Sequence, residues 1–137
     1  MDYDIKDLGL AESGHRKIKW AAANMPVLSR IADEFSVSKP FAGLRIAVSV
    51  HVEAKTAYLA QVLRIGGARV ALTGCNPLST QDDVAAALAS EGMEVFCIHG
   101  ADSETYVRHL RQALEFDPHI VIDDGGDFAQ LLHTTEQ

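Results

Sequence analysis

Three groups of polar residues combine side chains suited to acid–base chemistry with side chains that bind a hydroxyl-rich ligand. They are HVEAKT (51–56), GCNPLSTQD (74–82) and DDGGD (123–127). His51 titrates near neutral pH, so it can both donate and accept a proton, and a nearby carboxylate can hold it in orientation. The hydroxyl, amide and carboxylate groups of the other two segments can form hydrogen bonds with a ligand.

Each group directly follows a predicted β-strand. The predicted strands are 44–50, 68–74, 94–98 and 119–123, and the helices between them are 54–65, 80–92 and 102–115. This alternation predicts an α/β fold, a parallel Rossmann-like sheet with helices on both faces. Ligands of such sheets bind beyond the carboxyl ends of the strands, which is where all three groups lie.

The order of the strands decides which groups meet. In a dinucleotide-type order, 3-2-1-4, the first and fourth of these strands are neighbours, so His51 and Asp124 face each other across a crevice. A flavodoxin-type order gives the strands different neighbours. The sequence leaves both orders open.

The first forty residues have a helical pattern. Helices are expected at 10–24, with Asp7 as a possible cap, and from Pro26 to about residue 35. The segment 36–43 contains Pro40 and Gly43 and is typical of a linker. We therefore expect one substrate-binding domain over 1–137, with a helical segment at about 1–40, an α/β core at 41–137 and a last helix at about 126–133.

Composition argues against several classes of partner. The net charge of −7 disfavours nucleic acid, and no apolar run is long enough to span a membrane. The first ten residues lack the pattern of a signal peptide. Cys75 and Cys97 form no CxxC pair and no two histidines are four residues apart, so no metal site is expected. Two cysteines that are far apart in the sequence favour a reducing cytoplasmic location.

Each polar group also has a purely structural interpretation. His51 could be structural, Cys75 could be a small buried residue, and Ser79 or Thr80 could cap the following helix. An aspartate of DDGGD could cap the last helix, with the two glycines forming a turn. Three carboxylates within five residues repel one another, however, unless a ligand hydroxyl, a cation or a helix N-terminus receives them.

The turn after the first core strand reads VSVHVEAKTA (48–57) and contains no glycine. It therefore lacks the GxGxxG fingerprint, and no Walker loop occurs elsewhere. This chain is not expected to bind NAD or ATP through its first turn. A neutral, hydroxyl-rich ligand fits the polar segments better.

Five segments resemble the N-terminal substrate domain of the S-adenosylhomocysteine hydrolase family. They are MPVL (25–28), SKPFAGLRIA (38–47), His51 with Lys55-Thr56-Ala57, CNPLSTQDDVAAALA (75–89) and DDGGDFAQLLH (123–133). CNxxSTQD and DDGGD, in this order and spacing, are the specific ones. The resemblance covers essentially the whole chain.

The resemblance implies a longer, homo-oligomeric enzyme that cleaves S-adenosylhomocysteine to adenosine and homocysteine. Bound NAD oxidises the ribose 3′-hydroxyl, homocysteine leaves by elimination, water adds at C5′ and the ketone is reduced again. This chain is then expected to be a fragment that lacks the NAD-binding domain and is inactive alone. A stand-alone nucleoside-binding or assembly module remains the alternative, whereas a response regulator is disfavoured because its acidic pair would follow the first strand.

The family's pattern also implies roles for individual residues. His51 and Asp124 match an acid–base pair near C5′. The residues that match the substrate-binding loops are Glu53, Lys55, Thr56, Cys75, Asn76, Ser79, Thr80, Gln81 and Asp127.

Lys55 departs from the glutamate that many family members carry. Lysine donates and cannot accept, so it suits the O6 carbonyl of hypoxanthine better than the amino group of adenine. The sequence therefore suggests S-inosylhomocysteine, and the products inosine and homocysteine, as a possible substrate set. Equally open is a Lys55 that faces solvent or pairs with a carboxylate.

Overall fold

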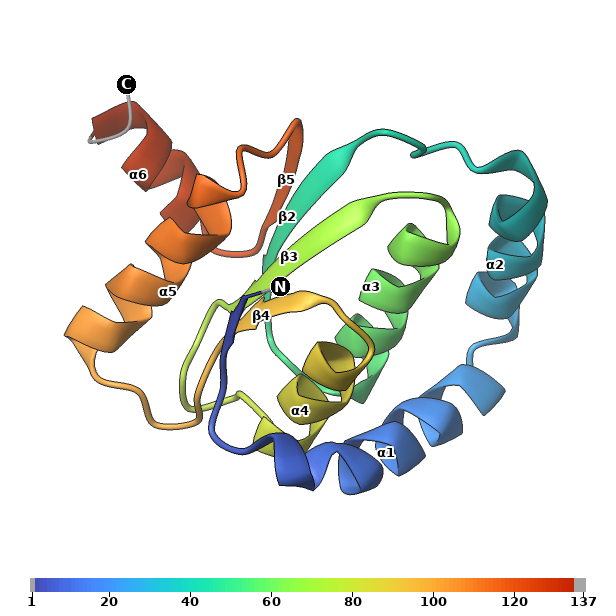
Figure 1. Ribbon diagram of the computed structural model, residues 1–137, viewed down its shortest axis with the longest axis horizontal. Coiled ribbons are helices and arrows are strands. Elements are labelled where there is room, and N and C mark those ends of the chain that lie inside the picture. Colours follow the sequence, from blue (N-terminus) through green and yellow to red (C-terminus); the bar gives the residue numbers. More distant parts are fainter. Residues whose placement is uncertain (1, 135–137) are drawn as a thin grey trace.

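The computed structural model describes residues 2–134, and within them five strands form one parallel sheet (Figure 1). The strands are β1 (Tyr3–Asp4), β2 (Arg45–Val50), β3 (Arg69–Gly74), β4 (Glu94–Phe96) and β5 (Ile120–Asp123). Their order is β1-β4-β3-β2-β5. The α/β prediction is confirmed, and the four predicted strands adopt the 3-2-1-4 order that makes β2 and β5 neighbours.

Helices cover both faces of the sheet. They are α1 (Ala11–Ala23), α2 (Pro26–Ser38), α3 (Ala54–Ile65), α4 (Asp82–Ser90), α5 (Ser103–Glu115) and α6 (Asp127–Thr134), with a short 3-10 helix η1 (Leu8–Leu10) before α1. Figure 1 shows α1 to α4 on one side of the sheet and α5 and α6 on the other. A large aliphatic core lies under the first four helices, and a smaller one, around Phe96, Leu110 and Phe128, lies under the last two. Of the helices described, none has both the length and the apolar character needed to cross a membrane.

The sequence pattern missed the edge strand β1, which has two residues and therefore no readable alternation. Asp4 anchors it. One carboxylate oxygen of Asp4 lies 2.8 Å from Nε2 of the buried His109 and accepts a hydrogen bond of 2.8 Å from Arg108. Helix α5 thus ties the N-terminal segment to the sheet.

Several helix ends differ from the predictions. Asp7 caps η1, by accepting a hydrogen bond from the Gly9 N–H, rather than α1. Helix α2 continues to Ser38 and stops where Lys39 adopts a left-handed conformation with φ 46°. Helix α4 begins at Asp82 after the N-cap residue Gln81, so neither Ser79 nor Thr80 caps it.

Helix α1 packs closely on α4 through Gly14. A Cβ atom on Gly14 would lie 1.9 Å from the Asp83 carbonyl oxygen, so only glycine permits this approach. The Asp83 carboxylate also accepts a hydrogen bond from Ser13 (2.7 Å) and pairs with Lys17 (2.9 Å). These contacts fix the start of α4 and hence the loop that precedes it.

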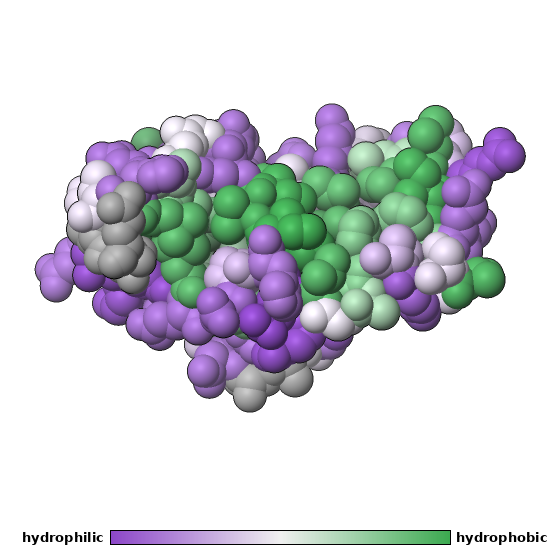
Figure 2. Space-filling model, turned by 90° about the horizontal axis from the view of Figure 1, so that it is seen from above, coloured by the Kyte–Doolittle hydropathy of each residue, from purple (hydrophilic) through white to green (hydrophobic). Residues whose placement is uncertain are grey.

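The other edge of the described sheet is β5. Its residues are less buried than those of β2, and Ile120 is 41% exposed. Figure 2 looks onto the upper side of Figure 1 and shows hydrophobic residues gathered in the middle of that face. The outer backbone groups of β5 are open to pairing with a further strand.

Candidate functional site

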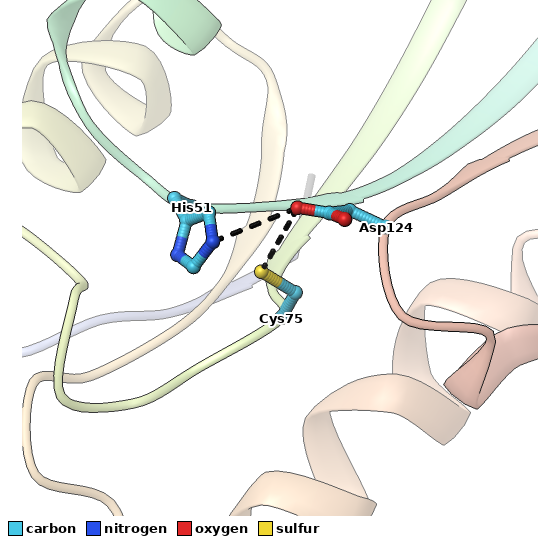
Figure 3. Close-up of side chains that lie close together, drawn as sticks. All are labelled: His51, Cys75 and Asp124. Carbon is cyan, nitrogen blue, oxygen red and sulfur yellow. Dashed lines mark hydrogen bonds and ion pairs between the residues drawn. The ribbon is translucent and has the colours of Figure 1, made fainter.

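The three polar segments meet at the carboxyl ends of neighbouring strands. His51 follows β2, Cys75 follows β3 and Asp124 follows β5, and their side chains point toward one another (Figure 3). His51 Nε2 lies 3.6 Å from Asp124 Oδ2, and Cys75 Sγ lies 3.8 Å from the same oxygen. The strand order therefore brings together groups that are 24 to 73 residues apart, numbered 51, 75 and 124.

Backbone hydrogen bonds hold two of these side chains in register. The Cys75 N–H donates to the Val50 carbonyl and the Asp124 N–H donates to the Ser49 carbonyl, both at 2.9 Å. The first bond lies one residue beyond the end of β3, and the second lies one residue beyond the end of β5. Each therefore extends the hydrogen bonding between β2 and that neighbouring strand. After Asp124 the chain turns away through Gly125, whose φ of 102° few other residues adopt.

Ser79 sets the orientation of His51. The Ser79 hydroxyl lies 2.7 Å from His51 Nδ1 and donates to the Asn76 carbonyl at 3.0 Å. A serine hydroxyl has one hydrogen, and when that hydrogen goes to the Asn76 carbonyl, Ser79 accepts a hydrogen bond from His51 Nδ1–H. In that tautomer Nδ1 carries the hydrogen, and Nε2, which faces Asp124, is the atom that can gain or lose a proton.

The three carboxylates of DDGGD have three separate partners. Asp123 accepts hydrogen bonds from the backbone N–H groups at the start of α6, as the structural interpretation expected. Asp124 faces His51. Asp127 accepts a hydrogen bond of 2.5 Å from the hydroxyl of Tyr106. Capping thus explains one aspartate and leaves two near the open rim.

Sequence reasoning missed Tyr106, which links two of the loops. Its hydroxyl lies 3.0 Å from the Cys75 carbonyl oxygen as well as 2.5 Å from Asp127. Burial, and next the hydrogen bond to Asp127, raise the pKa of Tyr106 well above its ordinary value, so it stays a donor. Tyr106 lies within α5 rather than at a strand end, so the strand-end pattern could not identify it.

Cys75 is a thiol rather than a thiolate at neutral pH. Burial, and then the charge of Asp124, raise its pKa to about 11. A protonated thiol is a weak nucleophile, so this environment favours a binding role over covalent catalysis.

Thr56 supports the turn that carries His51. Its hydroxyl donates to the His51 carbonyl and accepts a hydrogen bond of 3.2 Å from the Glu53 N–H, at the N-terminus of α3. Lys55 lies in the first turn of the same helix, is exposed, and has no hydrogen bond or ion pair within residues 2–134. Of the two structural possibilities for Lys55, the structure shows solvent exposure and no paired carboxylate.

The remaining predicted residues lie along the loop between β3 and α4. Asn76 is exposed, and its side-chain oxygen accepts a hydrogen bond of 2.9 Å from the Leu78 N–H. Gln81 is exposed and accepts a hydrogen bond of 3.2 Å from Lys17. Thr80 is only 3% exposed, so it packs beneath the loop rather than on its open side.

The first turn does not suit a dinucleotide. The N-cap of α3, where a pyrophosphate would bind in a dinucleotide fold, is Glu53, whose negative charge repels phosphate. No glycine lies in this turn to let a phosphate approach the backbone.

Comparisons of the sequence with known proteins identify its family. A sequence model of the family described as S-adenosyl-L-homocysteine hydrolase matches residues 2–137. The chain is 54% identical over 131 residues to the S-inosyl-L-homocysteine hydrolase of Methanococcus maripaludis. It is 52% identical over 134 residues to the adenosylhomocysteinase of Aquifex aeolicus and 50% identical over 133 residues to that of Pyrococcus abyssi.

These alignments cover 96–97% of this chain but only 32% of each relative. The chain thus spans about a third of the length of the relatives that it matches. Since the family model matches nearly every residue, the chain belongs to the S-adenosyl-L-homocysteine hydrolase family.

Proposed function

We propose that this chain forms the nucleoside-binding part of a hydrolase that cleaves S-adenosylhomocysteine or S-inosylhomocysteine to a nucleoside and homocysteine. The observation that carries the proposal is the position of His51 Nε2, 3.6 Å from Asp124 at the carboxyl ends of β2 and β5. Ligands of parallel sheets bind at this edge. The chain alone is expected to be inactive.

In this proposal His51 moves the proton at the 5′ carbon of the ribose. It gives a proton to the sulfur of homocysteine as the thioether bond breaks, and it takes a proton from the water that adds next. Asp124 stabilises the protonated imidazolium form of the ring, and Ser79 holds the ring in place. Each change of protonation occurs at Nε2.

The other polar residues of the rim are proposed to bind the sugar and base. Cys75 and Asp127 border His51 and Asp124, whereas Thr56, Ser79 and Thr80 shape the loops around them. The proposed substrate-binding residues are Glu53, Lys55, Thr56, Cys75, Asn76, Ser79, Thr80, Gln81 and Asp127. His51 and Asp124 have side chains that are 50% and 60% exposed, so we propose that other parts of the whole protein close the pocket.

NAD dependence is part of the proposal for the whole protein. NAD, when bound, supplies the oxidation of the ribose 3′-hydroxyl. Because Glu53 disfavours phosphate at the first turn, NAD is proposed to bind outside these residues. A homo-oligomeric, cytoplasmic enzyme is proposed from the family resemblance and from the two free cysteines.

Lys55 supports a preference for the inosyl substrate. Its ammonium group is exposed and unpaired within residues 2–134, on the turn that follows His51, so it is available to donate to a purine O6 carbonyl. Relatives named for either substrate share about half of their aligned residues with this chain, so identity does not decide between the two.

Homocysteine release by the whole protein tests the proposed function. With NAD present, release is expected from one or both thioethers, and Asp124→Asn is expected to lower kcat about 100-fold. The matched control is Asp117→Asn, since Asp117 has a side chain that is 93% exposed and pairs with Arg45. No release from either thioether, or equal losses in both variants, would refute the proposal.

A further inference from the structure

His51, Cys75 and Asp124 offer three atoms that one cation can share. His51 Nε2 and Cys75 Sγ lie 3.6 Å and 3.8 Å from Asp124 Oδ2, and all three atoms lie within 4.8 Å of one another (Figure 3). Two ligands of a tetrahedral zinc ion are about 3.3–3.8 Å apart, because the bonds to zinc are about 2.0–2.3 Å long. Small side-chain adjustments therefore bring all three atoms within bonding distance of one ion.

The surrounding hydrogen bonds direct lone pairs at the same point. In the tautomer in which His51 Nδ1–H donates to Ser79, the neutral ring has its lone pair on Nε2, facing the carboxylate oxygen of Asp124. Two acceptors that face each other repel unless a proton or a metal cation lies between them. Histidine ligands of metals commonly donate their second nitrogen to a neighbouring group in this way.

We propose that this cluster binds a borderline-soft divalent cation, Zn²⁺, through His51 Nε2, Cys75 Sγ and Asp124 Oδ2. A sulfur and an imidazole nitrogen favour Zn²⁺ over Mg²⁺ or Ca²⁺, which prefer oxygen ligands only. As the bond from Sγ to the metal forms, the thiol proton leaves to solvent. The side chains of His51 and Asp124 are half-exposed, so the ion can reach the site from solvent. The fourth coordination position then remains open to water.

Spacing along the sequence could not reveal this site, because its ligands follow three different strands. The site would also take the atom that the proposed function assigns to proton transfer. The consequence for activity rests on that proposed function: a bound Zn²⁺ excludes the nucleoside and inhibits the whole protein competitively.

Titration of the 137-residue chain with Zn²⁺ by calorimetry and with Co²⁺ by absorption spectroscopy tests the site. One saturable site is expected, with a thiolate-to-cobalt charge-transfer band that Cys75→Ala removes. His51→Gln and Asp124→Asn are each expected to weaken binding at least tenfold, whereas His133→Gln, an exposed histidine of α6, leaves it unchanged. Circular dichroism identifies any variant that fails to fold. The charge-transfer band of the unaltered chain tests thiolate coordination even if a variant does not fold.

The absence of saturable binding below about 1 mM metal would overturn the proposal, as would binding without a thiolate band. A repeat on the whole protein, with adenosine or inosine at saturation, separates the two proposals. A weaker apparent Zn²⁺ affinity supports a shared site. Zn²⁺ binding that the nucleoside leaves unchanged contradicts the proposed function and not the metal site.

Discussion

His51 Nδ1 lies 2.7 Å from the Ser79 hydroxyl, although the two residues are 28 positions apart in the chain. Ser79 also lies 3.0 Å from the Asn76 carbonyl oxygen, to which its hydroxyl can donate. This pair makes the loop after β3 a support for the residue that follows β2. The orientation of the proposed proton-transfer group therefore depends on a residue that itself transfers no proton.

Ser79→Ala is expected to lower kcat of the whole protein about tenfold, with a smaller change in KM, because one hydrogen bond worth about 1–1.5 kcal/mol orients His51. Ser90→Ala is a matched control, since Ser90 bonds His15 at 3.0 Å, away from the rim at the other end of α4. Steady-state kinetics measures both variants. Equal effects of the two substitutions would contradict the role given to Ser79.

Lys55→Glu is expected to shift the ratio of kcat/KM for the inosyl and adenosyl thioethers at least about tenfold toward the adenosyl substrate, because the donor becomes an acceptor. Lys19→Glu, an exposed lysine of α1, makes the same charge change as a control. Parallel assays of both thioethers measure the ratio. A strong adenosyl preference that Lys55→Glu leaves unchanged would refute this assignment.

Gly14→Ala is expected to destabilise the chain by about 1–3 kcal/mol, because its Cβ would overlap the Asp83 carbonyl. Helix propensity alone predicts the opposite sign, a gain of about 1 kcal/mol for alanine. Lys19→Ala, on the exposed side of α1, should change stability by less than about 0.5 kcal/mol. Urea denaturation measures the free energy of unfolding of both variants. A loss in Gly14→Ala indicates that close packing dominates, whereas a gain indicates that helix propensity dominates.

Asp4→Asn is expected to cost about 1–3 kcal/mol at pH 7, because it leaves the buried His109 without its charged partner. Burial raises the pKa of Asp4, but the hydrogen bonds from Arg108 and His109 outweigh burial and hold the net pKa below its ordinary value. The stability that Asp4 contributes is therefore present above about pH 4 and is lost as the pH falls through its lowered pKa.

Urea denaturation of the unaltered chain and of the Asp4→Asn variant across this pH range measures the effect. The difference in free energy of unfolding between the two proteins should shrink below about pH 4. A difference that stays constant from about pH 7 to about pH 3 would show that Asp4 contributes no charge-dependent stability.

Much of the fold follows from the sequence, because strands buried on both faces and helices ended by glycine have clear patterns. Helix α3 begins and ends where the pattern predicts, at residues 54 and 65. Strand β1 escaped prediction because it depends on a hydrogen bond between Asp4 and His109, a residue 105 positions away. No local pattern records such a contact.

The candidate site shows the same division. His51 and Asp124 could be paired once a strand order was assumed, because strand ends of a parallel sheet share one edge. The contacts that orient them could not be derived. The contacts of Tyr106 and of Ser79 depend on how α5 and the loop after β3 pack in three dimensions.

The most direct test of the proton-transfer role is a single-turnover measurement on His51→Asn in the whole protein with NAD and substrate. Reduction of the cofactor and release of homocysteine are followed separately. Because His51 is proposed to act at the 5′ carbon, cofactor reduction should remain within about tenfold of the unaltered protein while homocysteine release falls about 100-fold or more. Homocysteine release at an unaltered rate, or an equal loss of both steps, would contradict the account.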